Sequence, residues 1–141
     1  MMPITDVKIT SNAQAVKEAL AEDIERALEA VGLQAMGNAQ DIITAEGRVD
    51  TGQLRNSIAY HVDMGEKAVY IGSNLEHAIY NEVGTGIYAE GGGGRKTPWR
   101  YVDANGEGHW TVGMKPIHFL KRAVSDYQSE YEGIIDAELR K

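Results

Sequence analysis

The sequence predicts an α+β domain in which helices pack on an antiparallel sheet. Three patterns indicate this class: a long amphipathic stripe over residues 16–42, two hairpin patterns over residues 58–71 and 99–112, and a second apolar stripe that continues to the C-terminus. The chain has 141 residues and no visible internal repeat, which suits one domain. We therefore expect residues 1–141 to form a single domain: an antiparallel sheet of two hairpins plus an N-terminal strand, packed against a long N-terminal helix and a C-terminal helix.

The N-terminal third predicts a strand followed by a long helix. Residues 6–10 alternate apolar with polar side chains, and Ser11–Gln14 then has the S-x-x-Q form of a capping box. Apolar residues recur every three or four positions between residues 16 and 42, so the helix is roughly 30 residues long. Gly32 and Gly37 either bend this helix, permit a close helix approach or are weak spots in an otherwise good helix. The opposite side of the helix carries a row of carboxylates: Glu18, Glu22, Glu25 and Glu29.

The middle and the end of the chain predict a hairpin between helices. Asp50 or Thr51 provides a side-chain oxygen that caps a short helix. Residues 58–71 then alternate as the two strands of a hairpin, and a short helix follows over residues 75–83. Near the end, Pro116 is expected to open the last helix from its first turn, because proline lacks an amide that this turn would leave unpaired.

A glycine-rich loop and a second hairpin lie at about 84–113, and we call this segment the arm. Six of the sixteen glycines fall between residues 84 and 94. Asn105-Gly106 is a strong hairpin signal between two short strands, at residues 99–102 and 109–112. The arm also carries a group of aromatic side chains, namely Tyr88, Trp99, Tyr101 and Trp110.

These aromatic residues leave two interpretations open. Either the aromatic face of the hairpin packs into the core of the domain, or it docks on another subunit, since aromatic side chains are enriched at the centres of interfaces. Arg95, Lys96 and Arg100 form a basic cluster beside them, in a chain whose net charge is −7. This cluster either keeps an exposed loop solvated or contributes to the same contact.

Several classes of function are disfavoured by composition and spacing. The chain has no cysteine, so it has no disulfide, thiol nucleophile or cysteine-ligated metal, and its acidity argues against wrapping DNA. The G-x-G-x-x-A pattern at residues 84–89 does not join a strand to a helix as a dinucleotide site requires, and the calcium-like run at residues 103–108 has Met114 where a carboxylate is needed. The four histidines have no metal-ligand spacing, and no apolar run spans a bilayer. The sequence thus predicts no enzyme, no cofactor, no metal and no membrane partner.

Four segments in a fixed order carry a resemblance to a known family. They are Val49-Asp50-Thr51-Gly52-x-Leu54-Arg55-x-Ser57-Ile58, Tyr80-Asn81-Glu82-Val83-Gly84-Thr85-Gly86, Thr97-Pro98-Trp99 and Lys115-Pro116-x-x-Phe119-Leu120. The ordered set closely resembles the tail-completion family (head–tail joining or minor tail component proteins) of long-tailed bacteriophages and prophages. The resemblance implies scaffold roles for the matching residues: Asp50, Thr51, Gly52, Leu54, Arg55, Ser57, Tyr80, Glu82, Gly84, Thr85, Pro116, Phe119 and Leu120.

The same resemblance implies a structural protein of the virion, assembled in the bacterial cytoplasm. Such a protein forms a ring, a hexamer or a dodecamer, at the neck between portal and tail tube or at the tail end. Its neighbours would be head-connector or portal-side proteins and tail terminator or tail tube proteins, and DNA would pass through the channel as non-specific cargo.

We expect the arm to form the subunit contact in such a ring, through Tyr88, Gly91, Gly92, Gly93, Gly94, Arg95, Lys96, Trp99, Tyr101 and Trp110. Glu18, Glu22, Glu25 and Glu29 are candidate channel-lining residues, because carboxylates repel the phosphates of a sliding duplex. The alternative function is a non-catalytic adaptor domain that binds a protein partner through the aromatic hairpin.

Overall fold

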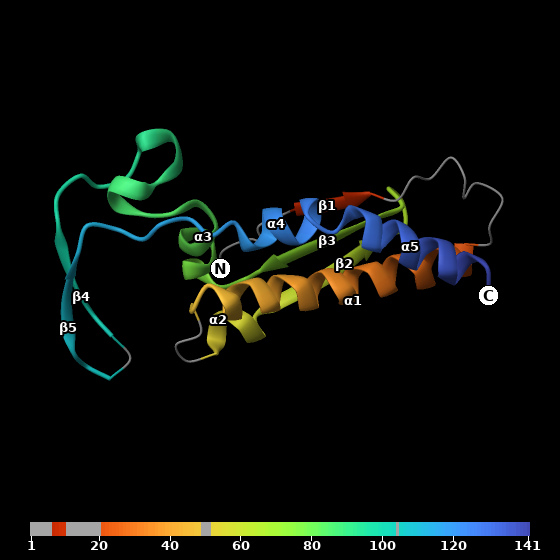
Figure 1. The fold of residues 1–141 in the computed structure, drawn as a ribbon, viewed down its shortest axis with the longest axis horizontal. Helices are drawn as coiled ribbons and strands as arrows, with labels where there is room; N and C mark the ends of the chain where they lie inside the picture. The colour runs from red at the N-terminus through yellow and green to blue at the C-terminus, as the bar shows by residue number, and fades with distance from the viewer. Residues whose placement is uncertain (1–6, 11–20, 49–51, 104) are drawn as a thin grey trace.

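The computed structural model describes residues 7–10, 21–48, 52–103 and 105–141. The fold is α+β, as the sequence predicts (Figure 1). Its main elements are the strands β1 (Val7–Thr10), β2 (Ile58–Asp63) and β3 (Ala68–Ser73), the long helix α1 (Ala21–Ala45) and the C-terminal helices α4 (Phe119–Ser125) and α5 (Gln128–Leu139). Shorter elements are the helices α2 (Gln53–Asn56) and α3 (Glu76–Val83), the 3-10 turns η2 (Gly86–Tyr88) and η3 (Glu90–Gly92), and the hairpin strands β4 (Trp99–Val102) and β5 (Gly108–Thr111).

A three-stranded antiparallel sheet and a layer of helices form the body of the molecule. The strand order is β1-β3-β2, and Ile71 of the central strand pairs with Val7 on one side and Tyr60 on the other. Helix α1 packs on β2 and β3 and also on α4 and α5, while α4 packs on β1. The buried side chains of these elements make one apolar core. We call this sheet, together with helices α1 to α5, the body.

Helix α1 approaches the sheet closely because of one glycine. A Cβ atom added to Gly32 would lie 2.8 Å from the Cγ2 atom of Val69 and 2.7 Å from the Cγ atom of Tyr60. A larger residue at this position would have to displace the side chains of Tyr60 and Val69, so Gly32 permits a close approach, in this structure between the helix and the sheet. Gly37 has nothing within 4 Å of its added Cβ. The capping box predicted at Ser11–Gln14 lies outside the described residues.

One buried polar pair links α1 to α5. The side-chain amide of Asn38 donates to the hydroxyl of Tyr131 at 3.0 Å, and this hydroxyl donates to the backbone carbonyl of Ala123. Tyr131 is among the largest fully buried side chains of the core. Each polar atom of the pair therefore has a partner inside the core, as burial requires.

Three details differ from the sequence prediction. The expected single C-terminal helix is divided into α4 and α5, with Asp126 and Tyr127 between them. The hairpin β4–β5 forms a two-stranded sheet of its own and does not join the sheet of the body; it lies at one end of the molecule (Figure 1). Strand β4 has no fully buried residue, so it has no face to pack on the body. The last helix begins at Phe119 rather than Pro116, because the amide of Ile117 bonds the carbonyl of Asn81 at 2.8 Å and holds this stretch against α3. No helix in the described part of the chain is long and apolar enough to cross a membrane.

Candidate functional site

The arm leaves the body at about residues 84–88 and returns to it at about residues 111–115; we call these two stretches the legs of the arm. The legs are joined by hydrogen bonds next to the body, and we call this place the root of the arm. The amide of Thr85 donates to the carbonyl of Met114 at 2.9 Å, and the amide of Met114 donates back to the Thr85 hydroxyl at 2.9 Å. Gly84 has a φ of 81°, and an added Cβ would lie 2.9 Å from the Cδ atom of Pro116. Only glycine suits both this left-handed backbone and this space. The Gly84-Thr85 segment therefore fixes where the arm leaves the body.

Glu82 ties helix α3 to the start of helix α4. Its buried carboxylate accepts the amide of Leu120 at 2.8 Å and the amide of Lys121 at 3.0 Å. A carboxylate at a helix N-terminus satisfies free amides and is favoured by the helix dipole. Phe119 and Leu120, which this contact positions, are fully buried. The predicted scaffold role of Glu82 thus has a concrete geometry in this structure.

Arg48 links three segments beneath the arm. Its guanidinium donates to the side-chain oxygen of Asn81 at 2.9 Å and to the carbonyl of Lys115 at 2.9 Å. The Asn81 side chain also donates to the carbonyl of His77 at 3.1 Å. These bonds hold the end of α1, helix α3 and the returning leg of the arm together.

The first family-like segment pins helix α2 to α1 and β3. The Ser57 hydroxyl lies 2.6 Å from the Ser73 hydroxyl, and the Arg55 guanidinium donates to the Thr44 hydroxyl at 3.0 Å. Gly52 is left-handed with a φ of 80°, and Leu54 is buried. Asp50 and Thr51, predicted to cap this helix, lie outside the described residues.

The glycine run makes a compact turn at the start of the arm. Gly91 and Gly92 have φ values of 78° and 71°, and the amide of Gly92 donates to the carbonyl of Ala89. An added Cβ at Gly94 would lie 2.7 Å from the Cβ atom of Ala89. The glycines are therefore required by backbone conformation at two positions and by close packing at a third. Gly93 and Lys96 are exposed.

The hairpin presents aromatic residues on both faces rather than on one. Trp99 pairs with Thr111, Arg100 pairs with Trp110, and Tyr101 pairs with His109. Paired residues of antiparallel strands share a face, and neighbours along a strand alternate between faces. Trp99 and Tyr101 therefore lie on one face, which we call the inner face, and Trp110 lies on the outer face. The prediction of a single aromatic face, which included Trp110, was wrong in this respect.

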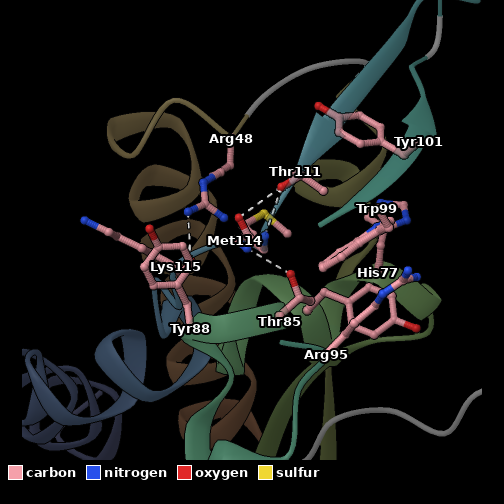
Figure 2. A pocket seen from close by; sticks show the side chains of 13 residues that line it. Arg48, His77, Thr85, Tyr88, Arg95, Trp99, Tyr101, Thr111, Met114 and Lys115 are labelled. Carbon is pink, nitrogen blue, oxygen red and sulfur yellow. Dashed lines mark hydrogen bonds between the residues drawn. The ribbon is translucent and has the colours of Figure 1, made fainter. Parts of the chain in front are cut away.

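The inner face borders a hollow between the arm and the body. This hollow has a volume of about 1080 Å³, and its wall includes residues from the end of α1, from α3 and from both legs of the arm (Figure 2). Two cations lie over aromatic rings of the wall: the Arg95 guanidinium is 5.7 Å from the centroid of Trp99, and the Lys115 ammonium is 5.6 Å from that of Tyr88. Such stacking holds a positive charge beside an apolar surface.

Exposed apolar side chains gather on the arm. Among the described residues, the exposed large hydrophobic side chains are Leu33, Tyr80, Ile87, Tyr88, Tyr101, Val102, Trp110 and Val112. Six of these eight lie between residues 87 and 112, and Trp110 is the most exposed at 73%. Exposed apolar side chains that gather in one segment are typical of an interaction site. The interpretation of Trp110 as a core residue is wrong, because nothing in the described chain covers it.

The tip of the hairpin is a hydrogen-bonded turn. Asp103 accepts the amides of Asn105 and Glu107, each at 2.9 Å, and lies 2.6 Å from the ring of His109. The bond to His109 and the bonds to the backbone amides lower the pKa of Asp103. This turn also brings the side-chain oxygen or nitrogen atoms of Asp103, Glu107 and His109 within 4.8 Å of one another. The predicted hairpin turn is confirmed.

The predicted channel-lining residues lie on the exposed side of α1. Glu22, Glu25 and Glu29 are exposed, on the side of the helix turned away from the core, and Glu18 lies outside the described residues. Their role in a channel stays a prediction, as does the subunit contact through the arm.

The sequence did not single out the body side of the hollow. Arg48, His77, Met114 and Lys115 line it, and they come from three segments that are distant along the chain. Lys115 stands in a family-like segment, directly before Pro116, and Arg48 directly precedes another. Their places in or beside these segments were the signal in the sequence that pointed to Lys115 and Arg48.

A comparison with protein families matches residues 8–84 to the HK97-gp10-like family, described as "Bacteriophage HK97-gp10, putative tail-component". The match covers more than half of the chain. The chain belongs to the HK97-gp10-like family. The resemblance to a phage tail family is therefore confirmed. Searches of curated proteins and of solved structures found no match.

Membership in this family makes the chain a bacteriophage tail component. A tail component is part of the virion and contacts other structural proteins of the phage. The family thus favours a structural role over a catalytic one. The matched residues include β1, α1, the hairpin β2–β3 and α3, and they end at Gly84, where the arm begins.

Proposed function

We propose that this HK97-gp10-like chain completes the phage tail and joins it to the head by assembling into a ring. The observation that carries the proposal is the concentration of exposed apolar side chains on the arm, on a tail component whose core is formed elsewhere. An uncovered patch of aromatic and aliphatic residues on a virion protein is best explained by a neighbouring subunit.

The asymmetry of the surface supports a ring. The arm projects from one end of the body, whereas the exposed side of α1 faces a different direction (Figure 1). A contact between two different surfaces of identical subunits is heterologous, and it closes into a ring when the rotation between subunits allows. We expect six or twelve subunits, bordered by head-connector or portal-side proteins and by tail terminator or tail tube proteins.

We also propose that the exposed side of α1 lines the channel of this ring. Glu22, Glu25 and Glu29 there would repel the phosphates of DNA, so that the duplex slides without binding. An assembled structure with these carboxylates on the outside of the ring would contradict this part of the proposal.

Deletion of the gene from its phage tests the function. We expect separate filled heads and tails by electron microscopy, and restoration of joined particles when the chain is supplied from a plasmid. Mass spectrometry of purified virions should then find the chain at a multiple of six copies per particle. Joined, infectious particles without the gene would contradict the proposal.

The same experiment separates the alternative of an adaptor domain. An adaptor that binds a protein partner through the hairpin would be recovered from the lysate with that partner and would be missing from purified virions. Recovery in the virion fraction at ring stoichiometry supports the structural role instead.

A further inference from the structure

The hollow at the root of the arm combines an apolar wall with positive charge. Aromatic rings of Tyr80, Tyr88, Trp99 and Tyr101 form much of the wall (Figure 2). Arg48, Arg95 and Lys115 contribute cations, and no carboxylate is among the described residues that line the hollow. Its best occupant has apolar side chains next to a negative charge.

The outer face and the tip of the hairpin have these properties. Val102 and Trp110 lie on the outer face and are 61% and 73% exposed. The adjoining tip, residues 103–108, carries two carboxylates, and the guanidinium of Arg100 lies beside Gly108 at the edge of this tip. Glu107 at this tip is exposed.

We infer that the hollow of one subunit receives the arm of a second copy of this chain, with the outer face of the hairpin against the aromatic wall and the tip beside the cations. This inference rests on the proposed ring, and it adds which two surfaces meet. Charge complementarity between Glu107 and Lys115 sets the direction of insertion.

Two features of the surface bear on the choice of occupant. Arg100 shares the outer face with Trp110, and the aromatic wall accommodates a guanidinium over a ring as it already does for Arg95. The exposed side of α1 is a weaker match, because it offers carboxylates with Leu33 as its exposed large apolar residue. The arm supplies both the apolar area and the charge.

This contact is heterologous by construction. The inner face of the hairpin belongs to the hollow, and the outer face belongs to the part that is inserted, so each subunit can receive one arm and donate its own. Repetition of the contact around an axis gives a closed ring without leaving an uncovered arm. The small two-stranded sheet also gains the packing that an isolated hairpin lacks.

Cysteine cross-linking tests the contact directly, because the natural chain contains no cysteine. Val102→Cys marks the outer face, His77→Cys marks the hollow, and Ser129→Cys on α5 is the matched control at an exposed position away from both. Full-length variants carrying different tags are mixed in pairs, assembled and treated with a short bis-maleimide. We expect the Val102→Cys and His77→Cys pair to give heterodimers, and the double variant to give a ladder that ends at the ring number.

Other outcomes would overturn the inference. Cross-links only between two Val102→Cys subunits would indicate a symmetric contact, and cross-links from Val102→Cys to Glu25→Cys would place the arm on α1. Rings seen by electron microscopy without a cross-link to His77→Cys would overturn the inference and leave the ring intact. A chain that stays monomeric at every concentration and is missing from virions would overturn both.

A charge exchange provides a second readout. Lys115→Glu should raise the protein concentration at which half of the chain is assembled by about tenfold. Adding Glu107→Lys to the same chain should restore most of the lost assembly. Lys121→Glu, at an exposed position on α4, is the control and should leave assembly unchanged. Equal losses in the single and the double variant would contradict a direct contact between these two charges.

Discussion

The body and the arm use their large apolar side chains in opposite ways. In the body, Phe119, Leu120 and Tyr131 are at most 1% exposed and pack against α1 and the sheet. In the arm, Val102 and Trp110 are more than half exposed, and the hairpin pairs only with itself. The body therefore obtains its stability from its own core, whereas the arm has apolar area that the described residues of the same chain leave uncovered.

The boundary between the two regions is made by specific contacts of a few residues. Gly84, Thr85 and Met114 join the legs of the arm at its root, and Glu82 caps α4 just before this point. The family match also ends at Gly84. Family membership thus rests on the body, and the proposals for the arm rest on the structure of this chain. Substitutions in the body should therefore change the free energy of unfolding, and substitutions in the arm should change assembly.

The largest expected effect is in the core of the body. Phe119→Ala should lower the free energy of unfolding by about 3–5 kcal/mol, because it leaves a cavity where the ring packed. Trp110→Ala, the matched substitution in the arm, should change it by less than about 0.5 kcal/mol. Urea unfolding followed by far-UV circular dichroism measures both. Equal losses for the two variants would break the comparison.

The link between the regions should come next. Glu82→Gln should lower the free energy of unfolding by roughly 3 kcal/mol, because an amide group then faces one of the two amides that the carboxylate accepted. Glu90→Gln is the control, since Glu90 is half exposed and bonds only the ring of His118 among the described contacts. The same urea titration applies, and a wild-type value for Glu82→Gln would argue against this cap.

Tyr131 should make the body sensitive to alkali. Burial raises its pKa to about 12, from 10.0 in an unfolded chain. The folded state then keeps a proton that the unfolded state loses, so this contribution is complete below pH 10 and is lost as the pH rises through 12. The loss amounts to at most about 3 kcal/mol. Tyr131→Phe should unfold with a shallower pH dependence above pH 10, whereas Tyr127→Phe should match the wild type; an unchanged slope in Tyr131→Phe would refute this.

The smallest effect should be local to the arm. The pKa of Asp103 is lowered by its bonds to His109 and to the turn amides. The contribution of the carboxylate to the turn is therefore present above about pH 4 and is lost as the pH falls further, when Asp103 is protonated. Nuclear magnetic resonance should show the amides of Asn105 and Glu107 shifting together in acid. Asp103→Asn should remove the transition, and its persistence would show that another group titrates.

Elements with strong local signals were predictable. The apolar spacing of α1 fixes which side is buried, and Asn105-Gly106 specifies the turn between β4 and β5. These signals depend on residues close together in the chain. Periodicity indicates that a face is buried or exposed, but it does not identify the partner of that face.

Features that join distant segments were not predictable for this reason. Glu82 bonds an amide 38 positions away, and the hollow needs Arg48, Trp99 and Lys115 together. The second hairpin forms a separate sheet because no residue of β4 is fully buried. The sequence pattern of this strand does not reveal that exposure. That Trp110 and Trp99 lie on different faces of the hairpin depends on which residues of β4 and β5 pair, and the sequence does not give this register.

The fluorescence of Trp110 during assembly tests the central claim most directly. Both tryptophans of the chain, Trp99 and Trp110, lie in the arm, so Trp99→Phe leaves Trp110 as the only tryptophan reporter. With rising protein concentration, light scattering follows assembly while emission follows the environment of Trp110. We predict a shift of the emission to shorter wavelength that coincides with ring formation, because the exposed indole becomes buried against a neighbour. Assembly with an unchanged, solvent-like emission would contradict the account.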